Sequence, residues 1–171
     1  GTEIAGSLVA GAVDLSSGRY VFGKYNGSRF YVWSYTESSN SFAYLGYIAT
    51  GTAPVGNGDM AFDANGNLYV VGSQSGASGN QVAIFSVTAA NFAGANGGAM
   101  TASISNTATL SGFDSGSSLN EVNGIAFSPR GTVYLGNASS LYEFDATTWK
   151  RIATSPRIAS NDSVDLASCA S

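Results

Sequence analysis

A hairpin pattern that occurs more than once is the feature that most constrains the fold of this chain. Residues 58–71 form two short apolar stretches around a polar turn, in which Gly66 can adopt positive φ and Asp63 can hydrogen-bond to the turn backbone. The pattern returns over residues 124–134. In both copies the turn glycine follows an alanine by five positions, and a tyrosine follows the same alanine by eight positions. The sequence therefore predicts a repeated antiparallel β-hairpin.

Two further copies of the pattern are less complete. Aligning Gly18 with Gly66 places Val13 at the position of Ala61 and begins a first repeat near the N-terminus. Residues 163–169 match the opening of that first repeat, at residues 12–18, but the strands that would follow are missing. The repeats start at positions 13, 61, 126 and 164, and their excess length is expected in surface loops.

Repeats of about forty residues with four strands each are typical of β-propeller blades. We predict an all-β chain of about three four-stranded blades plus one extra strand, which makes an incomplete ring. An immunoglobulin-like sandwich is the competing all-β interpretation, but a sandwich does not require equivalent hairpins. The predicted single domain covers residues 1–171, with repeats at about 11–50, 58–111 and 123–155 and a closing strand at 161–169.

Three short stretches have more specific assignments. Residues 4–9 are predicted as an edge strand before the first repeat. Within the second repeat, residues 93–98 are predicted as a glycine- and alanine-rich loop, and residues 101–110 as the fourth strand. Helix is expected to be negligible because no segment keeps a 3.6-residue period.

Composition argues against several classes of partner. The 171 residues include 22 glycines and no histidine, with 11% charged residues and a formal net charge of −4. Only seven lysines and arginines make nucleic acid and anionic membranes poor partners, and no apolar run approaches the roughly 18 residues that span a bilayer. The chain begins at Gly1 without a leader, so we expect it to be processed or cut from something larger. Cys169 either has a partner elsewhere or is an unpaired small residue.

Residues 124–145 resemble the blades of NHL-type and gluconolactonase-like propellers. Nearly the whole chain, with its blade at residues 58–71 and its closing strand at 164–169, resembles more closely the propeller-like repeat region of large secreted or wall-attached bacterial surface proteins, common in actinobacteria. The resemblance implies a propeller at the cell surface. A complete ring would need about twice these blades. We therefore expect completion by a missing half of the parent protein, by a second copy, or by head-to-tail association into a filament.

Acidic residues are the main candidates for chemistry, because the absence of histidine excludes Ser-His-Asp and Cys-His catalysis. Asp63 begins a run of alternating oxygen side chains that partly matches a calcium loop, although a turn-capping role explains it better. Gluconolactonase-like propellers hold a metal in their central tunnel, which Asp14, Asp59 and Asp165 would line. We expect these three carboxylates instead to cap strand ends or to bond neighbouring blades, and we predict no catalytic, metal or cofactor-binding residues.

The first repeat is dense in aromatic residues. On its third predicted strand, residues 29–35, Phe30 and Val32 face one way, whereas Tyr31, Trp33 and Tyr35 face the other. Core packing between blades is the default interpretation. An exposed ladder of Tyr31, Trp33 and Tyr35 would instead bind a glycan or a protein.

These observations favour a non-enzymatic, extracellular module of a bacterial cell-surface protein, with a structural or adhesive role and no cofactor. Its expected partner is protein, through self-association or the missing half of the parent, with a glycan as a further possibility. The alternative function is a metal-dependent, lactonase-like hydrolase of the gluconolactonase-like type.

Overall fold

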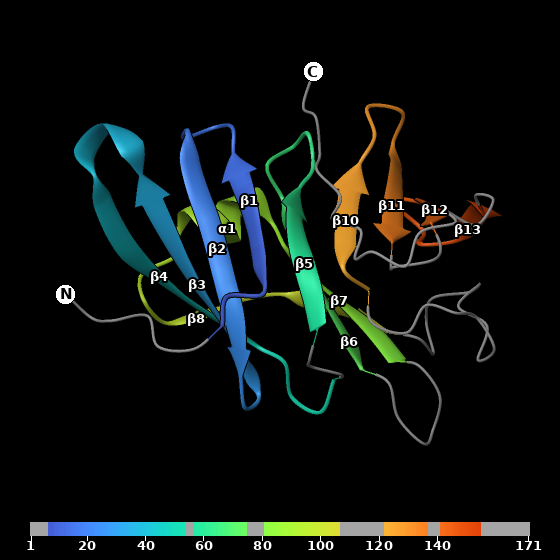
Figure 1. The fold of residues 1–171 in the computed structure, drawn as a ribbon, viewed down its shortest axis with the longest axis horizontal. Helices are drawn as coiled ribbons and strands as arrows, with labels where there is room; N and C mark the ends of the chain where they lie inside the picture. Colours follow the sequence, from blue (N-terminus) through green and yellow to red (C-terminus); the bar gives the residue numbers. More distant parts are fainter. Residues whose placement is uncertain (1–6, 54–56, 75–80, 107–121, 137–140, 155–171) are drawn as a thin grey trace.

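The computed structural model describes residues 7–53, 57–74, 81–106, 122–136 and 141–154 (Figure 1). This part of the chain is all-β, with three sheets of four or five strands, none of which closes on itself. The sheets follow one another along the molecule in sequence order (Figure 1). The predicted all-β fold is confirmed, and the arrangement is consistent with a propeller-like fold.

The first sheet has the strand order β1-β2-β3-β4-β8. Its first four strands form an antiparallel meander, and the short β8 pairs in parallel with β4. The strands are β1 (Ala10–Asp14), β2 (Arg19–Asn26), β3 (Arg29–Thr36), β4 (Ser41–Ala49) and β8 (Ala99–Met100), with a 3-10 turn, η1 (Glu37–Ser39), between β3 and β4.

The second and third sheets are antiparallel and contain four strands each. The second sheet consists of β5 (Asn57–Phe62), β6 (Leu68–Gln74), β7 (Gln81–Val87) and β9 (Ser103–Asn106). The third consists of β10 (Gly124–Phe127), β11 (Thr132–Gly136), β12 (Leu141–Asp145) and β13 (Arg151–Thr154). Their opening strands β5 and β10 lie side by side, and β1 lies beside β5 (Figure 1).

The repeated hairpins have the turn geometry that the sequence predicts. Gly66 and Gly131 both adopt φ of +77°, which disfavours any residue with a Cβ atom. In each turn the glycine N–H donates to a carbonyl three residues earlier, that of Asp63 or Ser128. Asp63 and Ser128 also accept a hydrogen bond at their side chains from the backbone N–H two residues later.

The first hairpin differs in register from the alignment on its turn glycine. Val13 pairs with Tyr20 and is 52% exposed, whereas Ala61 pairs with Tyr69 and is buried against the third sheet. The residues of β1 that pack on the core between the first and second sheets are Ala10 and Ala12. The placement of Val13 at the position of Ala61 is therefore wrong, because the turn after β1 differs in length from the others by one residue and reverses which side chains face the core.

The second sheet buries both of its faces. One face packs on the first sheet through side chains such as Val21, Phe30 and Phe85, and the other packs on the third sheet through side chains such as Ile84 and Phe144. Phe30, Phe85 and Phe144 are fully buried. Apolar residues on both faces of β6 and β7 follow from this double burial.

The chain between β7 and β9 departs from the prediction. Residues 89–93 form helix α1 (Ala89–Ala93), whose first turn is capped by the Thr88 hydroxyl, and β8 then joins the edge of the first sheet. The predicted loop at residues 93–98 therefore contains the end of a helix. The predicted strand at 101–110 is observed over β9. With only five residues, α1 is too short to cross a membrane, and no other described helix is long enough to do so.

Several predictions lie outside the described residues. They concern the closing strand at 161–169 with Asp165 and Cys169, residues 107–110 of the predicted fourth strand, and residues 4–6 of the predicted edge strand. The prediction is wrong for residues 7–9, which are not in a strand, because the first strand begins at Ala10.

Candidate functional site

The face of the first sheet that points away from the second sheet carries a grid of aromatic side chains. Cross-strand pairing sets these residues in three rows across β2, β3 and β4. The rows are Tyr20–Tyr35–Phe42, Phe22–Trp33–Tyr44 and Lys24–Tyr31–Tyr47. The eight aromatic residues of this grid are called the aromatic face below.

Trp33 lies at the centre of the aromatic face. Its ring centroid lies 6.3 Å from that of Phe22, 6.1 Å from that of Tyr31 and 5.6 Å from that of Tyr44. At the far row the Tyr35 and Phe42 rings lie 4.8 Å apart. Cross-strand aromatic pairs of this kind contribute about 0.2–1 kcal/mol each to sheet stability, so the rings hold one another in place.

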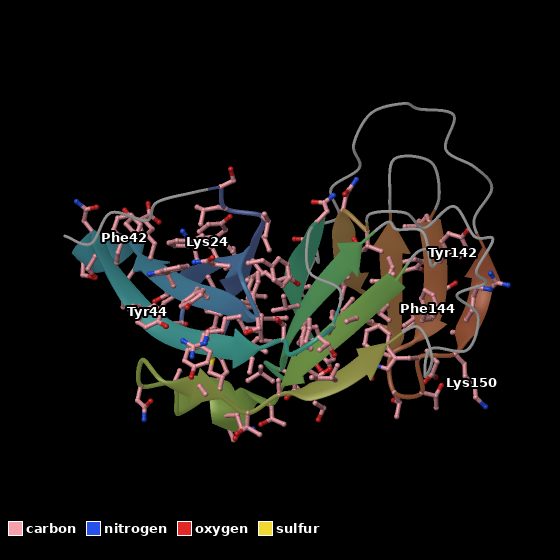
Figure 2. All side chains as sticks on the ribbon, turned by 90° about the horizontal axis from the view of Figure 1, so that it is seen from below. Lys24, Phe42, Tyr44, Tyr142, Phe144 and Lys150 are labelled. Atoms are coloured by element: carbon pink, nitrogen blue, oxygen red, sulfur yellow. The ribbon has the colours of Figure 1, made fainter. Side chains whose placement is uncertain are left out.

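Much of the aromatic face is accessible. Phe42 is 66% exposed, Tyr20 47% and Tyr44 42%, while Phe22 is buried beneath its neighbours. Tyr31, Trp33, Tyr35 and Tyr47 are half-buried. No other sheet of the described part of the chain covers this face. Figure 2 shows Phe42, Tyr44 and Lys24 on the sheet at one end of the molecule, with Tyr142, Phe144 and Lys150 at the other.

Two cations lie at one end of the aromatic face, near the turn between β2 and β3. The Lys24 ammonium lies 5.9 Å from the Trp33 ring centroid, and the Arg29 guanidinium lies 4.1 Å from that of Tyr47. A hydrogen bond with Tyr31 raises the pKa of Arg29, so the guanidinium stays charged. Within the described ranges neither cation forms a salt bridge, and this end of the face is positively charged.

Alternation along the strand predicts that Tyr31, Trp33 and Tyr35 share one side, and the structure confirms that they lie together on the aromatic face. Phe30 and Val32, predicted to face the other way, are fully buried against the second sheet. The aromatic residues of β2 and β4 lie on the same surface, which was not predicted from the sequence. Their alternation at positions 20 and 22 and at 42 and 44 is a signal that could have predicted it.

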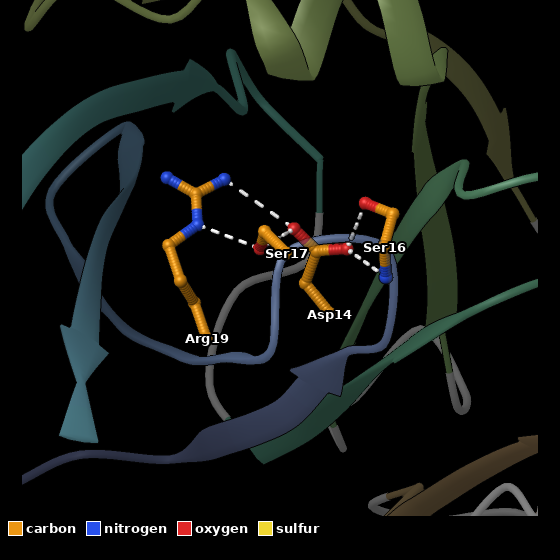
Figure 3. A network of polar contacts seen from close by, with 4 residues as sticks. All are labelled: Asp14, Ser16, Ser17 and Arg19. Atoms are coloured by element: carbon orange, nitrogen blue, oxygen red, sulfur yellow. Dashed lines mark hydrogen bonds and ion pairs between the residues drawn. The ribbon is translucent and has the colours of Figure 1, made fainter. Parts of the chain in front are cut away.

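Asp14 caps the turn that follows β1 (Figure 3). Its carboxylate accepts hydrogen bonds from the Ser16 backbone and hydroxyl and from the Ser17 hydroxyl, and it forms a 3.3 Å salt bridge with Arg19. Burial opposes ionisation, but these hydrogen bonds outweigh it and lower the pKa of Asp14. The expectation that Asp14 caps a strand end is confirmed.

Asp59 and Asp63 also have structural partners. Asp59 is buried, and its Oδ2 atom accepts a 3.0 Å hydrogen bond from the Ile125 backbone N–H, which joins the second and third sheets. The Asp63 carboxylate accepts hydrogen bonds from the backbone N–H groups of Asn65 and Asn67 at 2.9 Å. The predicted sheet-bonding role of Asp59 and turn-capping role of Asp63 are therefore confirmed. Among the described residues, no three acidic or cysteine side chains gather in a way that could hold a metal ion.

An open cleft of about 370 Å³ begins at the edge of the aromatic face. Tyr20 and Phe22 line one side, and Asn57, Asp59 and Asn123 line the other. The Asn57 amide N–H donates to the Asn123 side-chain oxygen across the second and third sheets. The cleft thus places amide groups beside the aromatic rings.

Comparison with known proteins informs the fold. No protein-family model matches this chain, and no curated protein matches it in sequence. Among solved structures, a chain of hydrazine synthase from Kuenenia stuttgartiensis is similar, with a TM-score of 0.53 and 14% identity. The match covers 89% of this chain and 37% of that chain. At this level of identity the similarity concerns the fold alone.

Proposed function

We propose that this chain is a non-enzymatic, extracellular module of a bacterial cell-surface protein, with a structural or adhesive role. The aromatic face is the observation that carries the proposal. It combines a half-exposed tryptophan and five tyrosines with two cations. Tyrosine, tryptophan and arginine are the residues enriched at the energetic centres of recognition surfaces.

The proposal includes the propeller interpretation. The three sheets would be three four-stranded blades, the first with the short β8 added at its edge, with β1, β5 and β10 innermost in a ring that this chain leaves open. The resemblance of the repeats to bacterial surface proteins supports the extracellular location. A partner chain or further blades would cover the ends of the open ring. Because a blade over the aromatic face would exclude a ligand there, the structural and adhesive roles predict different behaviour.

Binding and association can be measured on the same variants. We expect the purified chain either to bind isolated bacterial cell walls or to self-associate at micromolar concentration, measured by co-sedimentation and light scattering. Trp33→Ala should weaken whichever behaviour is observed by about tenfold, because it removes the centre of the face. Ile152→Ala, which removes an exposed apolar side chain of β13, is the control. A monomer that binds nothing would contradict the proposal.

The rival hydrolase has its own assay. Asp14 and Asp59, its candidate metal ligands, are engaged in the turn and inter-sheet hydrogen bonds described above. We expect no lactone hydrolysis with or without added calcium or zinc. Metal-dependent turnover that disappears in folded Asp14→Asn and Asp59→Asn variants would establish the hydrolase instead.

A further inference from the structure

We infer that the aromatic face binds a polysaccharide that carries carboxylate groups, with Trp33 at its centre and Lys24 and Arg29 against the carboxylates. This inference rests on the proposed adhesive function and names the chemical class of its ligand.

The aromatic face differs in composition from the surfaces by which the sheets pack on one another. The clusters between sheets are mainly aliphatic, with residues such as Val21, Val70 and Val133. Where a tyrosine enters such an interface its hydroxyl needs an acceptor, as Tyr25 shows by donating a 2.7 Å hydrogen bond to the Val71 carbonyl. On the aromatic face the Tyr35 hydroxyl donates to the Asn40 side chain and Tyr31 bonds with Arg29, so a covering blade would have to satisfy the hydroxyls of the other tyrosines. A sugar supplies hydroxyl groups along its whole length, together with C–H surfaces for the rings.

The size of the aromatic face fits a chain-like ligand better than a second protein. Three strands by about five residues give a footprint of roughly 10 by 15 Å. A stable protein–protein interface takes about 20–30 residues from each partner, whereas the eight aromatic residues and two cations of this face number ten. The face also continues through Tyr20 and Phe22 into the 370 Å³ cleft with its Asn57 and Asn123 amides. An elongated, hydroxyl-rich molecule fits both surfaces.

The charge of the face selects an anionic ligand. Lys24 and Arg29 form no salt bridge within the described part of the chain, so a bound carboxylate would be their ion-pair partner. The same features could attract single-stranded nucleic acid, whose bases stack on aromatic rings. Nucleic acid, however, carries a negative charge at every phosphate, and the protein has a net charge of −4 with only two cations at this surface, so its binding is disfavoured. Carboxylates spaced along a sugar chain match two cations better.

Intrinsic fluorescence provides a direct binding measurement. The chain has two tryptophans: Trp33 is on the aromatic face, and Trp149 is buried against the second sheet. Titration with hexagalacturonate should change the emission of Trp33, and Trp33→Phe should remove the change. We expect cellohexaose, a neutral chain of equal length, to bind about tenfold more weakly, and raised salt should reduce the difference.

Charge variants test the role of the two cations. The double variant Lys24→Gln/Arg29→Gln should bind hexagalacturonate about tenfold more weakly and cellohexaose unchanged, while Lys150→Gln, at the opposite end of the molecule, should match the wild type (Figure 2). Trp33→Ala should weaken both ligands by about tenfold. Should it fail to fold, Tyr44→Ala, at a 42% exposed position, tests the same face.

Three results would overturn the inference. One is equal binding of the acidic and neutral hexamers, or a double variant that behaves like Lys150→Gln. Another is tighter binding of hexathymidylate than of hexagalacturonate. The third is binding of neither sugar together with self-association that Trp33→Ala abolishes. That third result would leave the proposed function standing in its structural form, whereas lactone turnover would remove the proposed function itself.

Discussion

Single buried polar groups connect the sheets of this molecule. Asp59 is only 5% exposed, and its carboxylate accepts the hydrogen bond of the Ile125 N–H across the interface between the second and third sheets. A buried N–H that loses its acceptor is left desolvated and unpaired, which costs free energy. One carboxylate therefore contributes to the packing of two sheets.

Replacement of this carboxylate should be costly. Asp59→Ala is expected to lower the free energy of unfolding by about 1–3 kcal/mol, measured by urea denaturation. Glu37→Ala removes an exposed carboxylate on η1 and should stay within about 0.5 kcal/mol of the wild type. Equal changes in the free energy of unfolding for the two substitutions would show that the inter-sheet hydrogen bond does not stabilise the fold.

Two tyrosines should make the fold sensitive to alkaline pH. Burial raises the pKa of Tyr25 above its usual range, and burial with the nearby Asp63 carboxylate raises the pKa of Tyr69 to about 12. In the unfolded chain these phenols ionise near pH 10. Above that pH the unfolded state binds fewer protons than the native state, so the free energy of unfolding falls as pH rises.

The predicted fall can be followed from pH 9 to 11.5 by urea denaturation. Tyr25→Phe should reduce its slope, because one of the two groups no longer ionises on unfolding. Tyr20→Phe, on the exposed aromatic face, is the matched control. An unchanged slope in Tyr25→Phe would contradict the assignment to Tyr25.

The hairpins could be predicted at the level of the element, because turn glycines and capping side chains are local features. The register of the first hairpin could not be predicted in this way. In its turn the Asp14 carbonyl accepts hydrogen bonds from the backbone N–H groups of both Ser17 and Gly18. This turn differs in length from the other two by one residue, and that difference exchanges the side chains on the two faces of β1. Likewise β8 has two residues and no alternation, so its pairing depends on β4 rather than on its own sequence.

Close packing between β5 and β6 leads to a prediction for this pair of strands. A Cβ atom at Gly58 would overlap the Val71 carbonyl oxygen, which also accepts the Tyr25 hydroxyl. Gly58→Ala should therefore lower the free energy of unfolding by about 2 kcal/mol. Gly94→Ala, where the nearest atom would be 3.4 Å away, is the control in thermal melts. Equal melting temperatures for the two variants would contradict this packing.

The sequence pattern could not show whether the aromatic face is buried or exposed, because that depends on how the sheets are arranged in the whole molecule. Alternation in β3 shows that Tyr31, Trp33 and Tyr35 share a side, but an inner blade and an end blade have the same alternation. Burial of a face depends on a neighbouring sheet, which lies elsewhere in the sequence. Phe30 is buried because β6 and β7 supply that neighbour, and no described sheet does so for Trp33.

The shared second sheet should make unfolding a single event. Both core clusters include residues of that sheet, so its loss would expose the first and third sheets together. The single-tryptophan variants Trp33→Phe and Trp149→Phe report on opposite ends of the molecule. Within each variant, the remaining tryptophan and far-UV circular dichroism should give one urea midpoint. Separate midpoints would show that the sheets unfold independently.

The strand β8 has a consequence for how such proteins can evolve. By sequence it belongs to the second repeat, but Gly97 donates to the Leu45 carbonyl and Tyr47 donates to the Gly98 carbonyl, so it completes the edge of the first sheet. A recombination breakpoint placed between the repeats would separate β4 from that edge. Duplication or loss of one repeat at a time would leave an unpaired strand each time. The smallest segment that could be duplicated or lost without leaving a strand unpaired is therefore a pair of adjoining repeats.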